Sequence, residues 1–148
     1  MTMTTLSAQR SQYNNDAILS ASPVRLLTML YDRLLLDLGR AEIAHSQFDW
    51  PVMSSNLLHA QAIVSELSTS LKVELWDGGD NLLALYNYCN GLLITSNVRR
   101  DASGIRETIE LFEPLRQAWH EAAGQLSVPN RSDLTGSQST DSRELGVA

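Results

Sequence analysis

The sequence predicts an all-α fold, an antiparallel up-down four-helix bundle, and three observations support this prediction. Four segments carry apolar residues at helical spacing, with short turn signals between them. No segment of useful length alternates apolar and polar residues as a half-buried strand does. With 148 residues and 43% apolar side chains, the chain is long enough to bury one substantial core. Amphipathic helices of similar length joined by short turns favour such a bundle.

We expect three parts along the chain. Residues 1–20 form a flexible N-terminal arm, residues 21–126 form the bundle, and residues 127–148 form a disordered tail. The tail is rich in Ser, Thr, Gly and Asp, and its few apolar side chains cannot offset the entropy lost on ordering. The central part is therefore expected to hold the folded core.

The first helix is predicted over residues 23–47 and has two apolar faces. Ser22 can cap the free amides of its first turn, and Pro23 suits the first helical position. The expected core face consists of Leu27, Leu30, Tyr31, Leu34, Leu38 and Ala41. A second face, spaced by seven residues, consists of Met29, Leu36 and Ile43. The charged residues expected to separate the two faces are Asp32, Arg33, Asp37 and Arg40. Such a helix either sits inside a bundle or keeps one face for a partner.

The second helix begins at a similar signal, with Asp49 as its cap and Pro51 in its first turn. Its apolar positions alternate in steps of four and three, which is typical of a helix packed nearly parallel to a neighbour. These positions are Met53, Leu57, Ala60, Val64, Leu67 and Leu71.

Gly78-Gly79 breaks the chain, and the third helix is expected from Asn81. Its apolar face consists of Leu82, Leu85, Cys89, Leu92 and Ser96. The fourth helix follows a turn over residues 101–104, and its apolar positions are Ile105, Ile109, Phe112, Leu115 and Trp119. Pro114 lacks an N–H donor, so we expect it to kink or split this helix near Leu111.

Several single residues are interpreted as structural. The residues assigned to the core are Leu27, Tyr86, Tyr88 and Trp119. Cys89 is the one cysteine, so it cannot form an intramolecular disulfide, and its apolar surroundings favour a small core residue over a nucleophile. His59 and Glu66 are two helical turns apart and are assigned to a solvated face.

Composition and motifs exclude several classes of function. The formal charge is −6 and no basic cluster is larger than Arg99-Arg100, which disfavours nucleic acid as a partner. No apolar run is long enough to span a membrane, so a cytoplasmic protein is expected. The three histidines have no second ligand at metal-binding spacing, and no phosphate loop or nucleophile motif occurs. We therefore expect no catalytic residues, no metal and no cofactor.

An ordered series of short motifs runs through most of the chain. In order, the motifs are Tyr13, Ala21-Ser22-Pro23, Leu26, Met29-Leu30-Tyr31-Asp32, Glu66-Leu67, Ser70-Leu71, Gly78-Gly79, Asn81-Leu82, Leu85-Tyr86, Tyr88, Asn97, Asp101, Leu115-Arg116 and Ala118-Trp119. Together they resemble the FliS family of flagellar secretion chaperones. Two departures are Arg33, where the family usually has Gly, and the short stretch between Gly79 and Asn81, which predicts a shortened start of the third helix.

The resemblance implies a function and a partner. Members of this family are four-helix bundles whose N-terminal segment can lie across the bundle. They bind the C-terminal segment of flagellin in the cytoplasm, prevent its premature polymerisation and assist its export by the flagellar type III machinery. The alternative is a non-enzymatic helical adaptor with another cytoplasmic partner. The sequence does not indicate an oligomeric state.

The candidate partner-binding residues are Tyr13, Ile18, Leu26, Met29, Leu36, Ile43, Asn81 and Asn97. Met29, Leu36 and Ile43 are nominated to hold flagellin, although they could instead pack under the arm or the second helix. The arm residues Tyr13 and Ile18 either occupy the same groove when flagellin is absent or belong to a frayed terminus.

Overall fold

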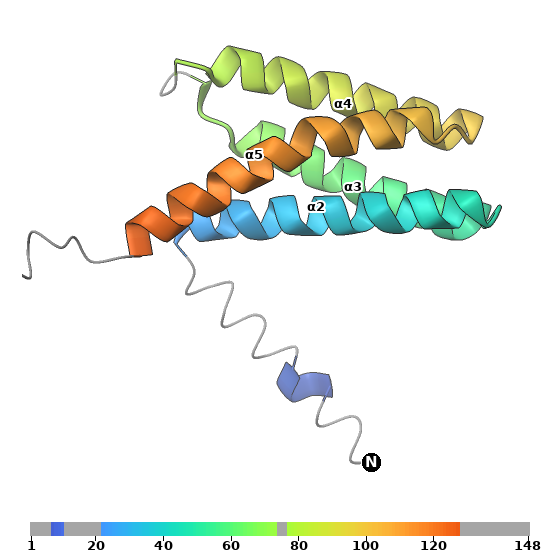
Figure 1. Cartoon of the computed structure of the whole chain (residues 1–148), viewed down its shortest axis with the longest axis horizontal. Helices are drawn as coiled ribbons and strands as arrows, with labels where there is room; N and C mark the ends of the chain where they lie inside the picture. The colour runs from blue at the N-terminus through green and yellow to red at the C-terminus, as the bar shows by residue number, and fades with distance from the viewer. Residues whose placement is uncertain (1–6, 11–21, 74–76, 128–148) are drawn as a thin grey trace, which may run out of the picture.

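The computed structural model describes residues 7–10, 22–73 and 77–127. Within these residues the long helices are α2 (Pro23–Ser46), α3 (Trp50–Ser70), α4 (Gly79–Arg99) and α5 (Ser103–Ser127) (Figure 1). Residues 7–10 form one helical turn, and no strand occurs in the described part of the chain. The all-α prediction is confirmed. The expected arm and tail lie almost wholly outside the described residues.

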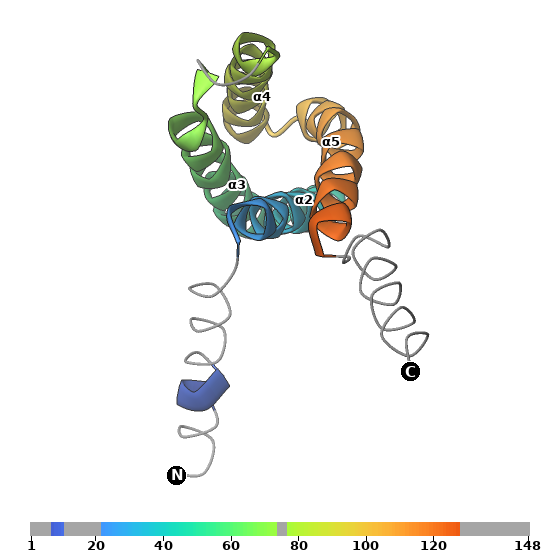
Figure 2. The same cartoon turned by 90° about the vertical axis from the view of Figure 1, so that its left-hand side faces the viewer.

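The four long helices are arranged in a ring. Figure 2 looks along the bundle and shows α2, α3, α4 and α5 following one another around it, each packed against two neighbours. Short turns reverse the chain between successive helices, so the starts of α2 and α4 lie at one end of the bundle and the starts of α3 and α5 at the other. This is the predicted up-down arrangement.

Side-chain caps fix the starts of the first two long helices. The Arg25 N–H donates to Ser22 Oγ at 3.2 Å, and the Val52 N–H donates to Asp49 Oδ1 at 3.3 Å. Pro23 and Pro51 occupy the first turns, where no intrahelical N–H bond is lost. Both predicted starts are confirmed because they depend only on local backbone chemistry.

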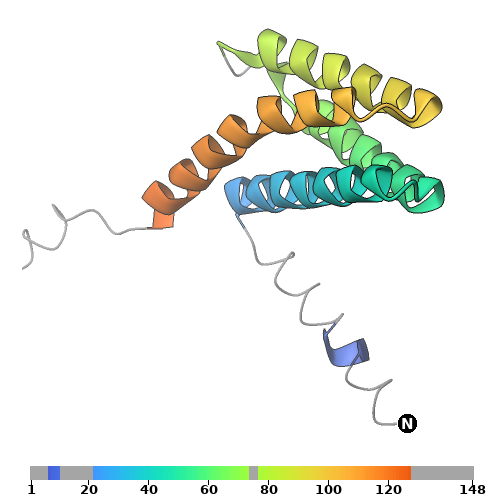
Figure 3. The same cartoon turned by 45° about the vertical axis from the view of Figure 1, so that its right-hand side comes forward.

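Helix α4 begins earlier than expected, at Gly79 rather than Asn81. A Cβ at Gly79 would lie 2.8 Å from the Val73 carbonyl oxygen, so only glycine allows this close backbone approach. Pro114 does not split the last helix, because α5 is continuous across it. Figures 1 and 3 show α5 bending away from the first half of α4. A bend is expected where proline removes one intrahelical hydrogen bond.

The core contains most of the predicted residues. The fully buried apolar side chains include Tyr31, Leu34, Leu38, Ala41, Leu57, Ala60, Val64, Tyr86, Cys89, Leu93, Ile105 and Phe112. Burial raises the pKa of the Cys89 thiol from 9.0 to about 11, which agrees with an inert core residue. The core assignment of Tyr88 is wrong: this side chain is 51% exposed and donates to Glu107 Oε1 at 2.6 Å. Leu27 and Trp119 lie half-buried at the edge of the core.

Candidate partner-binding site

The second apolar face of α2 lies on the outside of the bundle. Met29 is half-buried, Leu36 is 45% exposed and Ile43 is 60% exposed. At about 100° per residue, Arg33 and Arg40 fall on this same face, between the apolar side chains and not beside them. The expectation that these arginines separate the two faces is therefore wrong. The face, which we call the α2 stripe, combines apolar and cationic side chains.

Asp37 is also placed differently from the sequence prediction, because it is buried in the bundle. Its Oδ1 accepts a hydrogen bond from Arg33 Nε at 3.1 Å, and its Oδ2 contacts His59 Nδ1 across the α2–α3 interface. A buried carboxylate needs such partners to offset the loss of hydration. The assignment of His59 to a solvated face is thus incomplete: its side chain is half exposed, but its ring nitrogen helps to satisfy Asp37.

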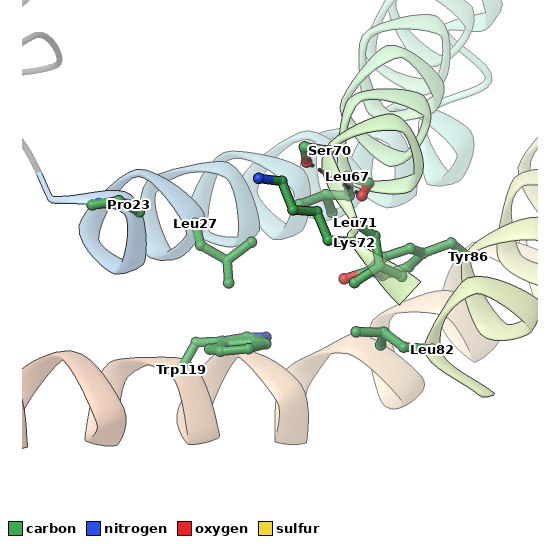
Figure 4. A pocket seen from close by; sticks show the side chains of 9 residues that line it. All are labelled: Pro23, Leu27, Leu67, Ser70, Leu71, Lys72, Leu82, Tyr86 and Trp119. Carbon is green, nitrogen blue, oxygen red and sulfur yellow. Dashed lines mark hydrogen bonds between the residues drawn. The ribbon is translucent and has the colours of Figure 1, made fainter. Parts of the chain in front are cut away.

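An apolar pocket of about 280 Å³ lies at the end of the bundle where α2 and α4 start (Figure 4). Its lining residues are Pro23, Leu27, Leu67, Ser70, Leu71, Lys72, Leu82, Tyr86 and Trp119. Leu27 and Trp119 face each other across it, from α2 and α5. The sequence did not reveal this pocket because its lining positions have the same apolar spacing as core positions.

Two of the lining residues, Tyr86 and Trp119, belong to a cluster of aromatic side chains inside the bundle. The hydroxyl oxygens of Tyr31 and Tyr86 lie 2.5 Å apart, and the rings of Tyr86 and Phe112 are stacked with centroids 5.9 Å apart. Tyr31 also contacts Trp119, at a centroid distance of 6.5 Å. Burial raises the pKa of both Tyr31 and Tyr86 above the ordinary value of 10.0, so both hydroxyls are neutral near pH 7. Tyr86 therefore adds no charge to the pocket that it lines.

The remaining candidate residues are spread over the molecule. Leu26 is half-buried on α2, and Asn81 is exposed in the first turns of α4. Tyr13 and Ile18 lie outside the described residues. The structure brings Leu26, Met29 and Asn81 to the end of the bundle that holds the pocket. Ile43 lies toward the opposite end.

Asn97 lies at that opposite end, in the last turn of α4. The C-cap residue is Arg100, in the left-handed conformation, and the Asp101 N–H donates to the Ser96 carbonyl oxygen at 3.1 Å. Asn97 is half-buried in a separate cleft of about 470 Å³ between the start of α3 and the end of α4. Its side chain forms no hydrogen bond with any residue described by the structure.

In the described part of the chain, no helix is both long enough and apolar enough to cross a membrane. No group of three His, Cys, Asp or Glu side chains in the same part of the chain is arranged to hold a metal ion.

Fold and surface together define a class of protein: an all-α bundle that presents apolar faces on a helical scaffold. The chain belongs to the FliS family, because the family model described as "Flagellar protein FliS" matches residues 6–126. FliS is a chaperone family and not an enzyme family, so the chain is not expected to be an enzyme. A role as a flagellar export chaperone follows from the family.

Individual relatives agree with this assignment. The flagellar secretion chaperone FliS of Escherichia coli (strain K12) is 34% identical over 108 residues, which cover 72% of this chain and 79% of the relative. The protein of the same description from Salmonella typhimurium is 33% identical over 115 residues, 75% of this chain and 84% of the relative. The protein of the same description from Bacillus subtilis is 29% identical over 112 residues, which cover 74% of this chain and 82% of the relative.

A solved structure supports the fold. A crystal structure of a bacterial flagellar chaperone matches with a TM-score of 0.65 and 17% sequence identity, and the match covers 78% of this chain and 98% of that one. At this identity the match demonstrates the shared helical architecture alone.

Proposed function

We propose that this chain binds the C-terminal segment of flagellin in the cytoplasm, prevents its premature polymerisation and assists its export by the flagellar type III system. Membership of the flagellar chaperone family supports the export role. The choice of flagellin as partner follows the sequence resemblance described above. The observation that carries the proposal is the α2 stripe, an apolar face that the bundle leaves exposed.

The stripe suits an amphipathic helix-forming segment. An export substrate that is held unfolded exposes apolar side chains, and covering them with a helical surface limits self-association. Met29, Leu36 and Ile43 are seven residues apart, so they extend over roughly 21 Å of helix at 1.5 Å per residue. A partner helix of about four turns can therefore contact all three.

The stripe also has a charge preference. Arg33 and Arg40 lie between its apolar side chains, and Arg40 forms no ion pair with the residues that the structure describes. Cations within an apolar face favour a partner helix that carries acidic residues among its apolar side chains. We expect binding to weaken as the salt concentration rises, since exposed charge pairs are screened.

A pull-down with two forms of flagellin tests the proposal. Full-length flagellin should be retained on the immobilised chain, and flagellin truncated at its C-terminus should not. Equal retention of both forms would show that the C-terminal segment is not the binding element. A parallel polymerisation assay should show delayed filament formation when the chain is added in equimolar amount, and an unchanged rate would contradict the proposed role.

A further inference from the structure

All four long helices contribute residues to the lining of the apolar pocket. Leu27 contributes from α2, Leu67 from α3, Leu82 from α4 and Trp119 from α5, and the buried Tyr86 also lines it. A helix that lies along a bundle needs a groove that is open at both ends. At about 280 Å³ the pocket is near the lower limit of about 300 Å³ for small-ligand sites, so it suits a few side chains and not a whole helix.

A single cation stands at the mouth of this pocket. Lys72 is the only lysine in the sequence, and it follows the end of α3. Lys72 lines the pocket together with Leu27 of α2, and in the view of Figure 4 its side chain extends in the direction of α2. Lys72 is exposed and forms no ion pair with any residue in the described ranges, Asp80 at the start of α4 included. The first turn of α2 contains no acidic residue.

These features are complementary to the end of a polypeptide chain. A C-terminus whose last side chains are apolar presents them directly beside its terminal carboxylate. An ammonium group at the rim of an apolar pocket can accept such a carboxylate while the neighbouring side chains fill the pocket.

We propose that this pocket receives the last residues of the bound partner, with their apolar side chains inside it and the terminal carboxylate paired with Lys72. This inference rests on the proposed function, in which the chaperone holds the partner's C-terminal segment. Lys72 then acts as a specificity-determining residue that recognises a free chain end.

A matched pair of peptides tests the inference. Two peptides share the C-terminal sequence of flagellin, one ending in the free acid and the other in the carboxamide. Calorimetric titration of the full-length chain should show that amidation weakens binding about fivefold, a typical effect for a partly exposed charge-assisted contact. In Lys72→Met the acid and the amide should bind equally. Lys72→Arg should retain the preference for the free acid, because arginine keeps the positive charge.

Arg99→Met is the control, since it removes one exposed cation at the opposite end of the bundle. It should leave the fivefold preference for the acid intact. Equal binding of acid and amide to the unmodified chain, or the same preference in Lys72→Met, would overturn the inference while leaving the proposed function standing. If neither peptide binds, the proposed function fails as well.

Chemical crosslinking provides a second, independent measurement. A carbodiimide activates the peptide carboxylate, the Lys72 amine attacks it, and an amide forms as the carbodiimide takes up the lost water and leaves as a urea. Mass spectrometry should find the last residue of the acid peptide joined to Lys72 and no such product with the carboxamide. A crosslink from Lys72 to residues 128–148 of the same chain, or to a second copy, would instead assign the pocket to that occupant.

Discussion

The two ends of the bundle differ in how α5 is held. At the tied end, where α5 starts, it packs closely on α4: a Cβ at Gly104 would lie 3.0 Å from the Leu92 carbonyl oxygen. At the open end, α5 is attached to α2 instead, because Asp32 accepts hydrogen bonds from Arg116 Nη1 at 3.0 Å and His120 Nε2 at 2.7 Å. The apolar pocket lies at this open end.

This difference shows how a bundle can keep one end available for a partner. The tied end is further secured by a hydrogen bond from His45 Nε2 to the Arg100 carbonyl oxygen at 2.8 Å. Pro114 lies in the α5 sequence between these two regions, and a proline inside a helix favours a bend. Figure 3 shows that α5 is bent. The tied end is therefore closely packed, whereas the open end keeps an unfilled apolar pocket.

The largest expected effect is at the tied end. Gly104→Val should lower the free energy of unfolding by about 2 kcal/mol, because its side chain overlaps Ser96 and the Leu92 backbone. Gly39→Val is the matched control, since a Cβ there meets nothing within 4 Å, and it should change stability by less than about 0.5 kcal/mol. Urea denaturation followed by circular dichroism measures both. Equal effects would show that the tied end is not closely packed.

The next effect concerns the buried pair of hydroxyls formed by Tyr31 and Tyr86. Tyr86→Phe should lower the free energy of unfolding by about 1 kcal/mol at pH 8, because the buried Tyr31 hydroxyl loses its hydrogen bond to Tyr86. Tyr88→Phe is the exposed control and should be nearly neutral, since water replaces the bond to Glu107.

The same pair predicts how stability depends on pH. Burial raises the pKa of Tyr31 and Tyr86 above 10.0, so unfolding releases protons at high pH. The stabilisation that comes from the two neutral tyrosine hydroxyls is fully present below pH 10 and is lost as the pH rises further. The neutral Cys89 thiol contributes in the same way, and its contribution is lost between pH 9 and about 11. The free energy of unfolding, measured from pH 8 to 11, should decline less steeply in Tyr86→Phe than in the unmodified chain. An identical profile would contradict the buried-hydroxyl explanation.

The α2 stripe extends from the open end to the tied end, and substitutions along it test how much of it the partner covers. Leu36→Asp should weaken binding of a flagellin C-terminal peptide at least about tenfold, because it places a charge in an apolar contact. Met29→Asp and Ile43→Asp should have similar effects if the partner contacts both ends. Melting temperatures should change little, since Leu36 and Ile43 are exposed.

Leu58→Asp on α3 is the control for the stripe, because Leu58 is also an exposed apolar residue. It should leave peptide affinity unchanged. A parallel loss of helical content in the stripe variants would place these residues in the core, and normal binding by all of them would exclude the stripe as the site.

The sequence predicted those features that depend on local chemistry. Ser22 and Asp49 cap their helices through bonds three residues away, so the two starts could be predicted from the sequence. The burial of Asp37 could not be predicted from the sequence, because one of its partners, His59, lies on another helix. Tyr88 was assigned to the core together with Tyr86, and this was wrong for Tyr88. Two positions along a helix place the two side chains on different faces, and only Tyr86 is buried.

The pocket was not predicted for a related reason. Pro114 indicates that the fourth helix bends, but the direction of the bend depends on contacts with other helices. Here Arg116 and His120 attach α5 to Asp32 of α2, and this attachment spans 84 and 88 residues of sequence. Spacing along a single helix contains no information about such pairings, so Leu27 and Trp119 could not be distinguished from core residues.

The smallest expected effect comes from filling the open end. Leu82→Phe adds volume to a half-buried side chain that lines the pocket. Its ring can occupy space that is free in the unbound chain, so the free energy of unfolding should change by less than about 1 kcal/mol. Affinity for the flagellin peptide should fall about threefold, because the partner's apolar side chains lose part of the pocket. If Leu82→Phe destabilises the chain as strongly as Gly104→Val, the open end is as closely packed as the tied end and the distinction between them fails.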